Sequence, residues 1–319
     1  TGSMQMDAEL EGVANLDLGG RGVPPLAEAA RARLGRSPVG AAADLLASLP
    51  RSSVVVLTTG IAPRPWISTS RIESDGPPGT AVLASVLLRG FDLRPVLVAE
   101  EEILPRLGGV FQAAGVTGRD LLRPFPIETS RARTAAIALL DELQPAALVS
   151  IERLGRNERG VFHSAFGLDV SAGKAPIDDL FAVATQRRIP TIGVGDGGNE
   201  IGMGAIRDAV RAHVAFGAEC QCGCGGGAAA IQATDVLVTG GTSNWAAYAI
   251  VAALAARLAR ADLLHRPDEE ERLLRTGVEL GLINGLSGAP DPDVDLIPLA
   301  AHRAIVELLA VIARRSIAG

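Results

Sequence analysis

The sequence is poor in aromatic residues and has no cluster of basic residues. Phe, Trp and Tyr together make up 3% of its 319 residues, and the formal net charge is -6. Surfaces that bind nucleic acids combine basic stripes with aromatic side chains on which bases stack. The composition therefore argues against nucleic acid as a partner.

Long apolar runs are also missing. The nearest candidate, 245–258, is shorter than the roughly 20 residues needed to cross a bilayer, so we expect no membrane contact. No signal-peptide pattern precedes Met4, and residues 1–4 resemble a remnant of cloning. We therefore expect a cytoplasmic protein whose residues 5–319 form a single α/β domain of one or two lobes.

Cysteine is scarce, and all of it lies in one segment. Cys220, Cys222 and Cys224 form a C-x-C-x-C motif that, on a strand, would place three thiols on one face for a soft metal. A closed zinc site needs a fourth ligand and usually has C-x-x-C spacing. We therefore favour small filling residues in a glycine-rich segment over a metal or redox role, and expect no disulfide in a reducing compartment.

Among the four histidines, His163 is the candidate for acid-base chemistry, because it lies in a loop beside Phe162 and Phe166. His213, His265 and His302 are predicted to lie on the exposed faces of helices.

Apolar residues are abundant, at 48%, and they alternate between two patterns. Short β-branched runs predict strands, and segments with helical spacing lie between them, which indicates a mostly parallel sheet with helices on both faces. The first 50 residues are mixed, with helical patterns at 24–34 and 38–49. Strands are predicted at 53–59, 95–99, 146–151, 190–194 and 234–239, and helices at 80–89, 101–114, 130–143, 206–214, 243–260, 268–280 and 299–314.

The most distinctive stretch is IGVGDGGNEIGMGAI, at 192–206. It is predicted to be a strand-to-helix turn, in which glycines let the backbone approach a ligand. Its glycines formally match G-x-G-x-x-G, but Asp196 would place a negative charge beside a pyrophosphate, so we expect no nucleotide cofactor. Asp196 and Glu200 with Asn199 suit a divalent cation or a substrate amine better.

Polar residues also follow the other predicted strands. The carboxyl ends of parallel strands meet at one edge of a sheet, so we expect these residues to share one site there. Arg153 could clamp a substrate carboxylate through its planar fork, or could form a surface pair with Glu152. Arg21, between glycines, is interpreted as a surface residue. The residues in question are Glu73 and Asp75, then Glu152, Arg153 and Asn157, and finally Ser243 and Asn244.

Four motifs together resemble the C-terminal module of the D-glutamate cyclase family. They are E-S-D-G-P-P-G at 73–79, S-I-E-R-L-G-R-N at 150–157, G-D-G-G-N-E-I-G-M-G at 195–204 and T-S-N-W at 242–245. The resemblance implies a hydro-lyase that closes D-glutamate, or a related acidic amino acid, to 5-oxo-D-proline with loss of water. The cysteine-rich segment departs from the family's pattern. The resemblance implies an additional N-terminal domain in the larger animal members, which we do not expect in this chain.

Under this interpretation the site takes a small acidic substrate and a divalent metal, Mn²⁺ or Mg²⁺. Two alternatives stay open: a Mn²⁺- or Mg²⁺-dependent phosphomonoester hydrolase, and a regulatory module that binds an acidic metabolite. A homo-oligomer is compatible with the sequence. The assigned roles are catalysis for Asp196, Glu200 and Glu152; substrate binding for Arg153, Asn157, Asn199, Ser243 and Asn244; and metal binding for Glu73, Asp75, Asp196 and Glu200.

Overall fold

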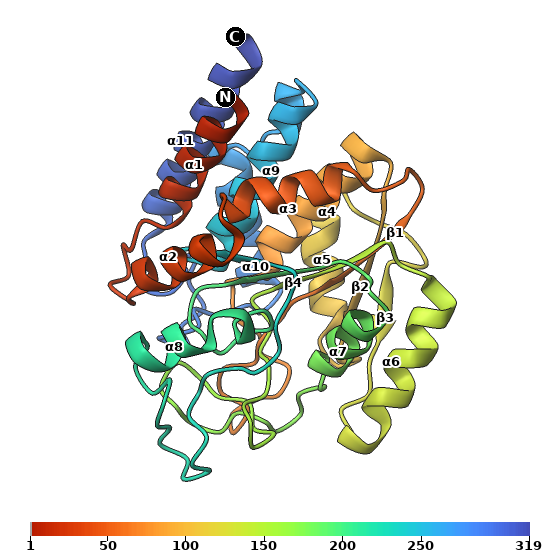
Figure 1. Cartoon of the computed structure of the whole chain (residues 1–319), viewed down its shortest axis with the longest axis vertical. Helices are drawn as coiled ribbons and strands as arrows, with labels where there is room; N and C mark the ends of the chain where they lie inside the picture. The colour runs from red at the N-terminus through yellow and green to blue at the C-terminus, as the bar shows by residue number, and fades with distance from the viewer. Residues whose placement is uncertain (1) are drawn as a thin grey trace.

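The computed structural model describes residues 2–319, and its centre is a six-stranded sheet in which every pair of neighbouring strands is parallel (Figure 1). The strand order is β3-β2-β1-β4-β5-β6. This confirms the predicted α/β class, although the short edge strand β3 was not predicted. The strands are β1 (Val54–Thr58), β2 (Arg94–Ala99), β3 (Leu122–Pro124), β4 (Ala147–Ile151), β5 (Thr191–Gly195) and β6 (Val236–Thr239).

The predicted helices are present, but the structure adds α1 and α7 and moves several helix ends. The fifth helix begins at Leu104 rather than near 101, because Pro105 has no N–H and fits only in a first turn. Within residues 2–319, no helix is both long enough and apolar enough to cross a membrane. The helices are α1 (Gly2–Ala14), α2 (Val23–Leu34), α3 (Pro38–Ala47), α4 (Pro77–Phe91), α5 (Leu104–Ala113), α6 (Thr129–Leu143), α7 (Asp178–Gln186), α8 (Arg207–His213), α9 (Ser243–Arg257), α10 (Pro267–Glu279) and α11 (Leu299–Ala318).

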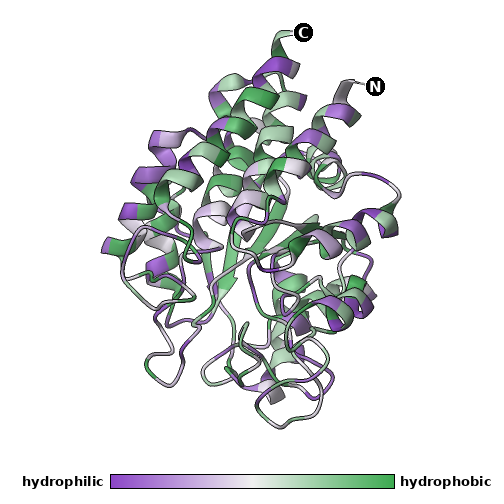
Figure 2. Cartoon of the chain, turned by 90° about the vertical axis from the view of Figure 1, so that its left-hand side faces the viewer, coloured by the Kyte–Doolittle hydropathy of each residue, from purple (hydrophilic) through white to green (hydrophobic). Residues whose placement is uncertain are grey.

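Helices cover both faces of the sheet, and alternate strand residues reach opposite layers. In β1, Val55 and Leu57 join the larger core with α1, α3, α4, α5, α9 and α11. Val54 and Val56 join a smaller core with α6 and α7. This explains the uninterrupted apolar run of β1, because a strand covered on both faces has no polar side. Figure 2 shows the strands as hydrophobic and enclosed by the helices.

The N-terminal end of helix α9 lies beside the end of β6, and the helix itself runs through the larger core. Thirteen of its fifteen residues are buried, and six of these are alanine, whose small side chain lets α3, α4 and α11 pack against it. Thr242, not Ser243 as predicted, caps the helix: its hydroxyl accepts a hydrogen bond from the Trp245 N–H at 3.2 Å. The Ser243 hydroxyl is therefore free for another contact.

Two of the three histidines predicted to be exposed are buried. His302 lies under α9, where its Nδ1 accepts a hydrogen bond from the Trp245 indole at 2.8 Å. An indole N–H can only donate, so the proton of this imidazole sits on Nε2, which donates to the Ile297 carbonyl at 3.1 Å. His265 is the second buried histidine, whereas His213 is exposed as predicted.

His265 makes the stability of the fold dependent on pH. Its Nε2 lies 2.6 Å from a carboxylate oxygen of the fully buried Glu270, and Glu269 lies on the other side of the ring. Burial acts to lower the pKa of His265, but the hydrogen bonds to Glu269 and Glu270 outweigh it and hold the pKa above its usual value. The stability that these hydrogen bonds contribute is fully present below the pKa of histidine in the unfolded chain, about 6.5. It is lost as pH rises through the higher pKa of His265 in the folded protein.

We therefore expect His265→Gln to lose most stability at low pH, so that the free energies of unfolding of parent and variant converge as pH rises. Urea unfolding across this pH range measures the difference. His213→Gln, on the exposed end of α8, is the matched control and should follow the parent at every pH. A constant gap between His265→Gln and the parent would contradict the assignment.

Candidate active site

The site lies where the strand order changes direction. From β1 the chain moves outward to β2 and β3, and from β4 it moves the other way to β5 and β6. The connections after β1 and β4 therefore diverge and leave a crevice at the carboxyl ends of the strands. Long connections gather at this end of the molecule, in the lower half of Figure 1.

Carboxylates from three of these connections, those after β1, β4 and β5, and from a late segment meet in the crevice. Asp75, Asp196 and Asp295 each place an oxygen within 4.8 Å of the others, and Glu152, Asp196 and Glu200 do the same. All five are buried, and Asp196 belongs to both groups. The structure thus brings together residues more than a hundred positions apart in the sequence, such as Asp75 and Asp196, as expected.

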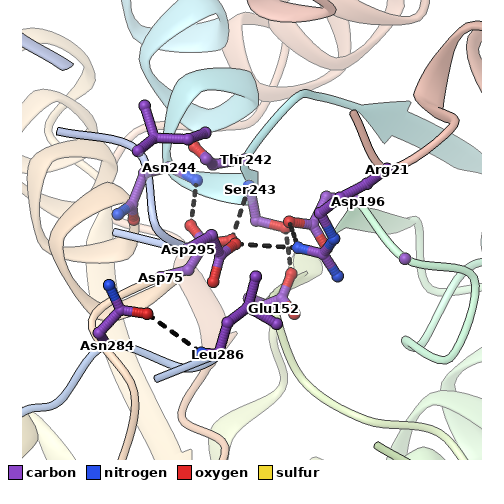
Figure 3. A network of polar contacts seen from close by, with 12 residues as sticks. Arg21, Asp75, Glu152, Asp196, Thr242, Ser243, Asn244, Asn284, Leu286 and Asp295 are labelled. Carbon is purple, nitrogen blue, oxygen red and sulfur yellow. Dashed lines mark hydrogen bonds and ion pairs between the residues drawn. The ribbon is translucent and has the colours of Figure 1, made fainter. Parts of the chain in front are cut away.

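Arg21 is the cation of this cluster, and its prediction as a surface residue was wrong. Its Nη1 donates to Asp196 Oδ2 at 2.9 Å and to Asp295 Oδ2 at 3.0 Å (Figure 3). The Asp17 carboxylate accepts hydrogen bonds from the backbone N–H groups of Arg21 and Gly22 and so fixes the turn. Gly20 and Gly22 both have positive φ, and this conformation directs the guanidinium inward.

Asp295 was not predicted at all. It lies in the segment between α10 and α11, which the sequence presents as a Pro/Asp/Gly connection. Val294 and Ile297 pair across a tight turn, and Asp295 and Leu296 within it have positive φ, at 52° and 63°. The turn buries the Asp295 carboxylate and leaves Leu296 exposed. The accumulation of aspartates in this segment was the available signal.

Asp75 is held at the start of α9. Its carboxylate accepts hydrogen bonds from the backbone N–H groups of Ser243 at 3.0 Å and Asn244 at 2.8 Å. A helix N-terminus carries unpaired N–H groups and a partial positive charge, so it stabilises an anion there. The expected substrate-binding residues Ser243 and Asn244 thus contact Asp75 through their backbone.

The Asn244 side chain joins the first turns of two helices. Its Oδ1 accepts hydrogen bonds from the N–H groups of Gly76 and Gly79, both at 2.9 Å, and its Nδ2 donates to the Ser74 carbonyl at 3.0 Å. These bonds lock the start of α4 against α9. The side chain predicted to bind substrate instead positions the loop that carries Glu73 and Asp75.

Glu152 and Glu200 have different surroundings. The Ser243 hydroxyl donates a hydrogen bond to Glu152, which directly follows β4 in a left-handed conformation with φ of 46°. Glu200 accepts hydrogen bonds from three consecutive N–H groups, those of Asp196, Gly197 and Gly198, at 2.6–2.8 Å. Its carboxylate therefore shapes the glycine turn.

Arg153 is not available as the expected clamp on a substrate carboxylate. Its guanidinium is 2% exposed and forms a bidentate pair with Glu100 at the end of β2. The carbonyls of Gly60 and Ala175 accept its other hydrogen bonds, at 3.1 and 3.0 Å. Residue 152 turns toward the crevice and residue 153 turns away from it.

Asn157 also lies outside the carboxylate cluster. Its Oδ1 accepts hydrogen bonds from the N–H groups of Arg159 and Val161, and its Nδ2 donates to the Gly227 carbonyl at 2.8 Å. Asn199 is closer to the cluster, and its Nδ2 donates to the His163 carbonyl at 2.9 Å. In the structure Asn157 holds two loops together, and its expected role in substrate binding stays a prediction.

The carboxylates cannot all be charged at neutral pH without more positive charge than Arg21 supplies. Burial, then repulsion from neighbouring carboxylates, raises the pKa of Glu73 and of Glu152 well above the usual value. Burial also raises the pKa of Asp196, against the opposing effect of Arg21, and that of Asp75 to about 7. The cluster therefore favours protons or another cation.

The donor set fits a hard divalent cation. Every ligand atom in the two groups is a carboxylate oxygen, which Mg²⁺, Mn²⁺ and Ca²⁺ prefer over nitrogen and sulfur. The Asp196 Oδ1 atom is buried and has no hydrogen-bond partner in residues 2–319. Buried polar atoms are normally satisfied, so this oxygen is suited to a ligand or an ion.

A cavity of about 130 Å³ opens beside the cluster. It is smaller than a typical pocket for a drug-sized ligand, which favours a compact metabolite. Trp66 and Phe166 at its edge are 60% and 50% exposed, so apolar side chains frame the entrance. The polar residues that line it are Arg21, Arg64, Glu73, Glu152, Ser164, Asn199 and Asp295.

A parallel α/β sheet with a carboxylate-lined cavity at its switch point is an arrangement typical of proteins that bind small molecules at the ends of their strands. Residues 10–310 match the family model described as D-glutamate cyclase-like, C-terminal, and the chain belongs to this family. This confirms the family inferred from the four motifs.

The chain is 33% identical over 260 residues to the human protein named D-glutamate cyclase, mitochondrial. The match covers 77% of this chain and 38% of the human protein, so the chain spans less than half the length of that relative. The human protein's name places it in mitochondria, and a cytoplasmic location for this chain stays a prediction.

Proposed function

We propose that the chain closes D-glutamate, or a closely related acidic amino acid, to 5-oxo-D-proline with loss of water. Family membership and the name of the human relative support this reaction. The observation that carries it is the group of buried carboxyls with raised pKa beside Arg21 in a small cavity. Ring closure needs both a base and an acid, and this cluster supplies both.

In the reaction, the α-nitrogen attacks the γ-carboxyl carbon, so that a C–N bond forms and a C–O bond breaks. The ammonium group loses two protons, which leave with the oxygen as water. Glu152 and Glu73 line the cavity. We assign ionised Glu152, oriented by the Ser243 hydroxyl, as the base, and protonated Glu73 as the acid for the leaving oxygen.

Arg21 is assigned to the substrate α-carboxylate in place of Arg153. Its Nη1 contacts Asp196 and Asp295, whereas its Nε and Nη2 have no hydrogen-bond partner in the described part of the chain. A guanidinium can bind a carboxylate through two parallel N–H groups, which fixes the substrate's orientation. Holding both ends of one substrate close together lowers the barrier by several kcal/mol.

Asp75, Asp196 and Asp295 would hold a divalent cation such as Mn²⁺ or Mg²⁺, with Glu152 and Glu200 adjoining through Asp196. Such an ion polarises a carboxylate and stabilises negative charge that develops on its oxygens. Glu200 keeps the glycine turn in shape, so Asp196 stays directed at the other carboxylates.

A second candidate is divalent-cation-dependent hydrolysis of a phosphomonoester. The sharing of Asp196 by two groups of three carboxylates favours it, because enzymes that bind a pair of ions often bridge them with one carboxylate. In this case the Nε and Nη2 groups of Arg21, which carry no other hydrogen bond in the described part of the chain, would face the phosphate.

One assay separates the candidates. Purified protein is incubated with D-glutamate, L-glutamate, 5-oxo-D-proline or a phosphomonoester, with Mn²⁺ or with a chelator. Formation of 5-oxo-D-proline from D-glutamate, or the reverse hydrolysis, supports the cyclase. Phosphate release that the chelator stops supports the hydrolase, and thermal stabilisation without turnover indicates a module that binds an acidic metabolite.

Binding of a hard cation should also stabilise the fold. With free Mn²⁺ at a hundred times its Kd, we expect the free energy of unfolding to rise by about 2.7 kcal/mol, and excess chelator to reverse the gain. Thermal unfolding with Mn²⁺, Mg²⁺ or Ca²⁺ measures it. Asp75→Asn should lose most of the gain, whereas Asp208→Asn, on the exposed face of α8, should keep it. No gain with any of the three ions would exclude this cation site.

A further inference from the structure

The three cysteines meet His163 outside the carboxylate cluster. Cys220, Cys222 and Cys224 lie between α8 and β6, and His163 lies in the long connection after β4. The His163 Nε2 atom is 3.3 Å from Cys222 Sγ and 3.6 Å from Cys224 Sγ. Cys220 Sγ lies 3.4 Å from Cys224 Sγ and 3.6 Å from Cys222 Sγ. Two loops thus bring three sulfurs and one imidazole nitrogen to one point.

These distances match the edges of a small tetrahedron. With Zn–S bonds of about 2.3 Å and Zn–N bonds of about 2.0–2.1 Å, tetrahedral geometry requires S–S separations of about 3.8 Å and S–N separations of about 3.6 Å. The observed separations are close to these values. All three cysteines are free, and a disulfide would need sulfurs about 2.05 Å apart.

We propose that Cys220, Cys222, Cys224 and His163 bind one Zn²⁺ in a closed tetrahedral site. The cluster supplies the fourth ligand that the C-x-C-x-C motif lacks. Thiolate and imidazole ligands select a soft or borderline ion, unlike the all-oxygen donors of the carboxylate cluster. Because all four positions are filled by protein atoms, the site is structural rather than catalytic.

The backbone explains how alternating cysteines converge without a strand. Gly223 and Gly225 have positive φ, at 82° and 80°, so the segment turns after each of the last two cysteines. The Gly226 N–H donates to Cys224 Sγ at 3.4 Å. The segment from Cys220 to Gly227 forms bends, so the thiols converge without the strand on which this spacing would place them on one face.

Asn157 supports the site from the second loop. Its Nδ2 lies 3.3 Å from Cys224 Sγ while it also donates to the Gly227 carbonyl. Donors of this kind stabilise a thiolate ligand and orient it. The buried His163 ring has no partner on Nδ1 in residues 2–319, so the thiols are its polar neighbours among the described residues.

The ion would fix one wall of the cavity. His163 directly precedes Ser164, Ala165 and Phe166, which line the cavity, and its carbonyl accepts the hydrogen bond from Asn199. The Gln221 N–H also donates to the Gly167 carbonyl at 2.8 Å. Zn²⁺ would therefore hold the loop after β4 against the loop before β6, whatever reaction the site performs.

Metal analysis of the full chain tests this proposal. After purification under reducing conditions and dialysis against Zn²⁺ and then buffer, we expect one tightly held zinc per chain. Co²⁺ in its place should give the intense visible absorption of tetrahedral thiolate coordination. Cys222→Ser and His163→Gln should lose the ion, and Asn157→Ala should weaken binding about 10–100-fold. Asp196→Asn is the control and should keep the zinc.

Three results would overturn the proposal. They are a parent protein that retains neither Zn²⁺ nor Co²⁺, zinc that remains after all three cysteines are changed to serine, and a disulfide within the motif under reducing conditions. If the variants do not fold, alkylation of the parent decides: Zn²⁺ should protect all three thiols, and equal alkylation rates with and without Zn²⁺ would refute the site.

Discussion

Asp196→Asn is expected to lower turnover about a thousandfold while the chain stays folded. Asp196 is the carboxylate shared by both oxygen-donor groups and the partner of Arg21, so the change weakens the cation site and the substrate clamp together. Positive charge against a developing oxyanion is worth several kcal/mol, and about 4 kcal/mol corresponds to a thousandfold in rate. Steady-state kinetics of whichever reaction the chain performs measures the loss.

The thermal stability of Asp196→Asn, unlike its turnover, should not fall. The asparagine side chain has nearly the same shape and removes one charge from a repelling cluster, so we expect thermal stability without added metal to be equal to or above that of the parent. Asp208→Asn, which changes an exposed aspartate on α8, is the matched control for both measurements. Activity of Asp196→Asn within a few-fold of the parent would remove this residue from the mechanism.

Arg153→Met is expected to destabilise the fold by about 3–5 kcal/mol, because it leaves the carboxylate of Glu100 buried and without its partner. Burial acts to raise the pKa of Glu100, but Arg153 outweighs this effect and holds the pKa below its usual value. The stabilisation by this pair is therefore present at neutral pH and is lost as pH falls through the folded pKa. Denaturant unfolding at neutral pH measures the cost.

A double-mutant cycle distinguishes this role from substrate binding. Arg153→Met combined with Glu100→Met should recover much of the lost stability, because the buried charge is then gone. Variants that remain folded should keep the parent KM, since Arg153 is not among the residues that line the cavity and both of its Nη atoms are engaged in buried hydrogen bonds. A raised KM with unchanged stability would contradict this assignment and restore Arg153 as the clamp.

The fold could be predicted from local patterns because its strands are covered on both faces. Continuous β-branched runs such as 54–58 are typical of strands buried on both faces, and the polar residues that follow parallel strands lie at one edge of the sheet. Helix α7, a nine-residue segment in the long connection between β4 and β5, was not predicted. The three-residue strand β3 is too short to have a recognisable pattern.

The site was harder to predict because its charge balance depends on contacts distant in sequence. Arg21 and Asp295 come from segments outside the β-α units, so no motif links them to Asp196, from which they are separated by 175 and 99 positions. Arg153 occupies a more suggestive position in the sequence, yet the left-handed conformation of Glu152 sends the two neighbouring side chains to opposite sides. Only tertiary structure determines which arginine reaches the crevice.

The hydrogen bond between Trp245 and His302 connects α11, the last helix, to the carboxylate cluster through α9. The first turn of α9 holds the Ser243 and Asn244 backbone against Asp75. Trp245, in the same turn, is held to α11 by this hydrogen bond. Deleting residues 299–319, which include α11, would remove that support and expose the Trp245 indole. We expect the proposed site residues to lose their alignment in such a truncated chain, although none of the deleted residues is among them.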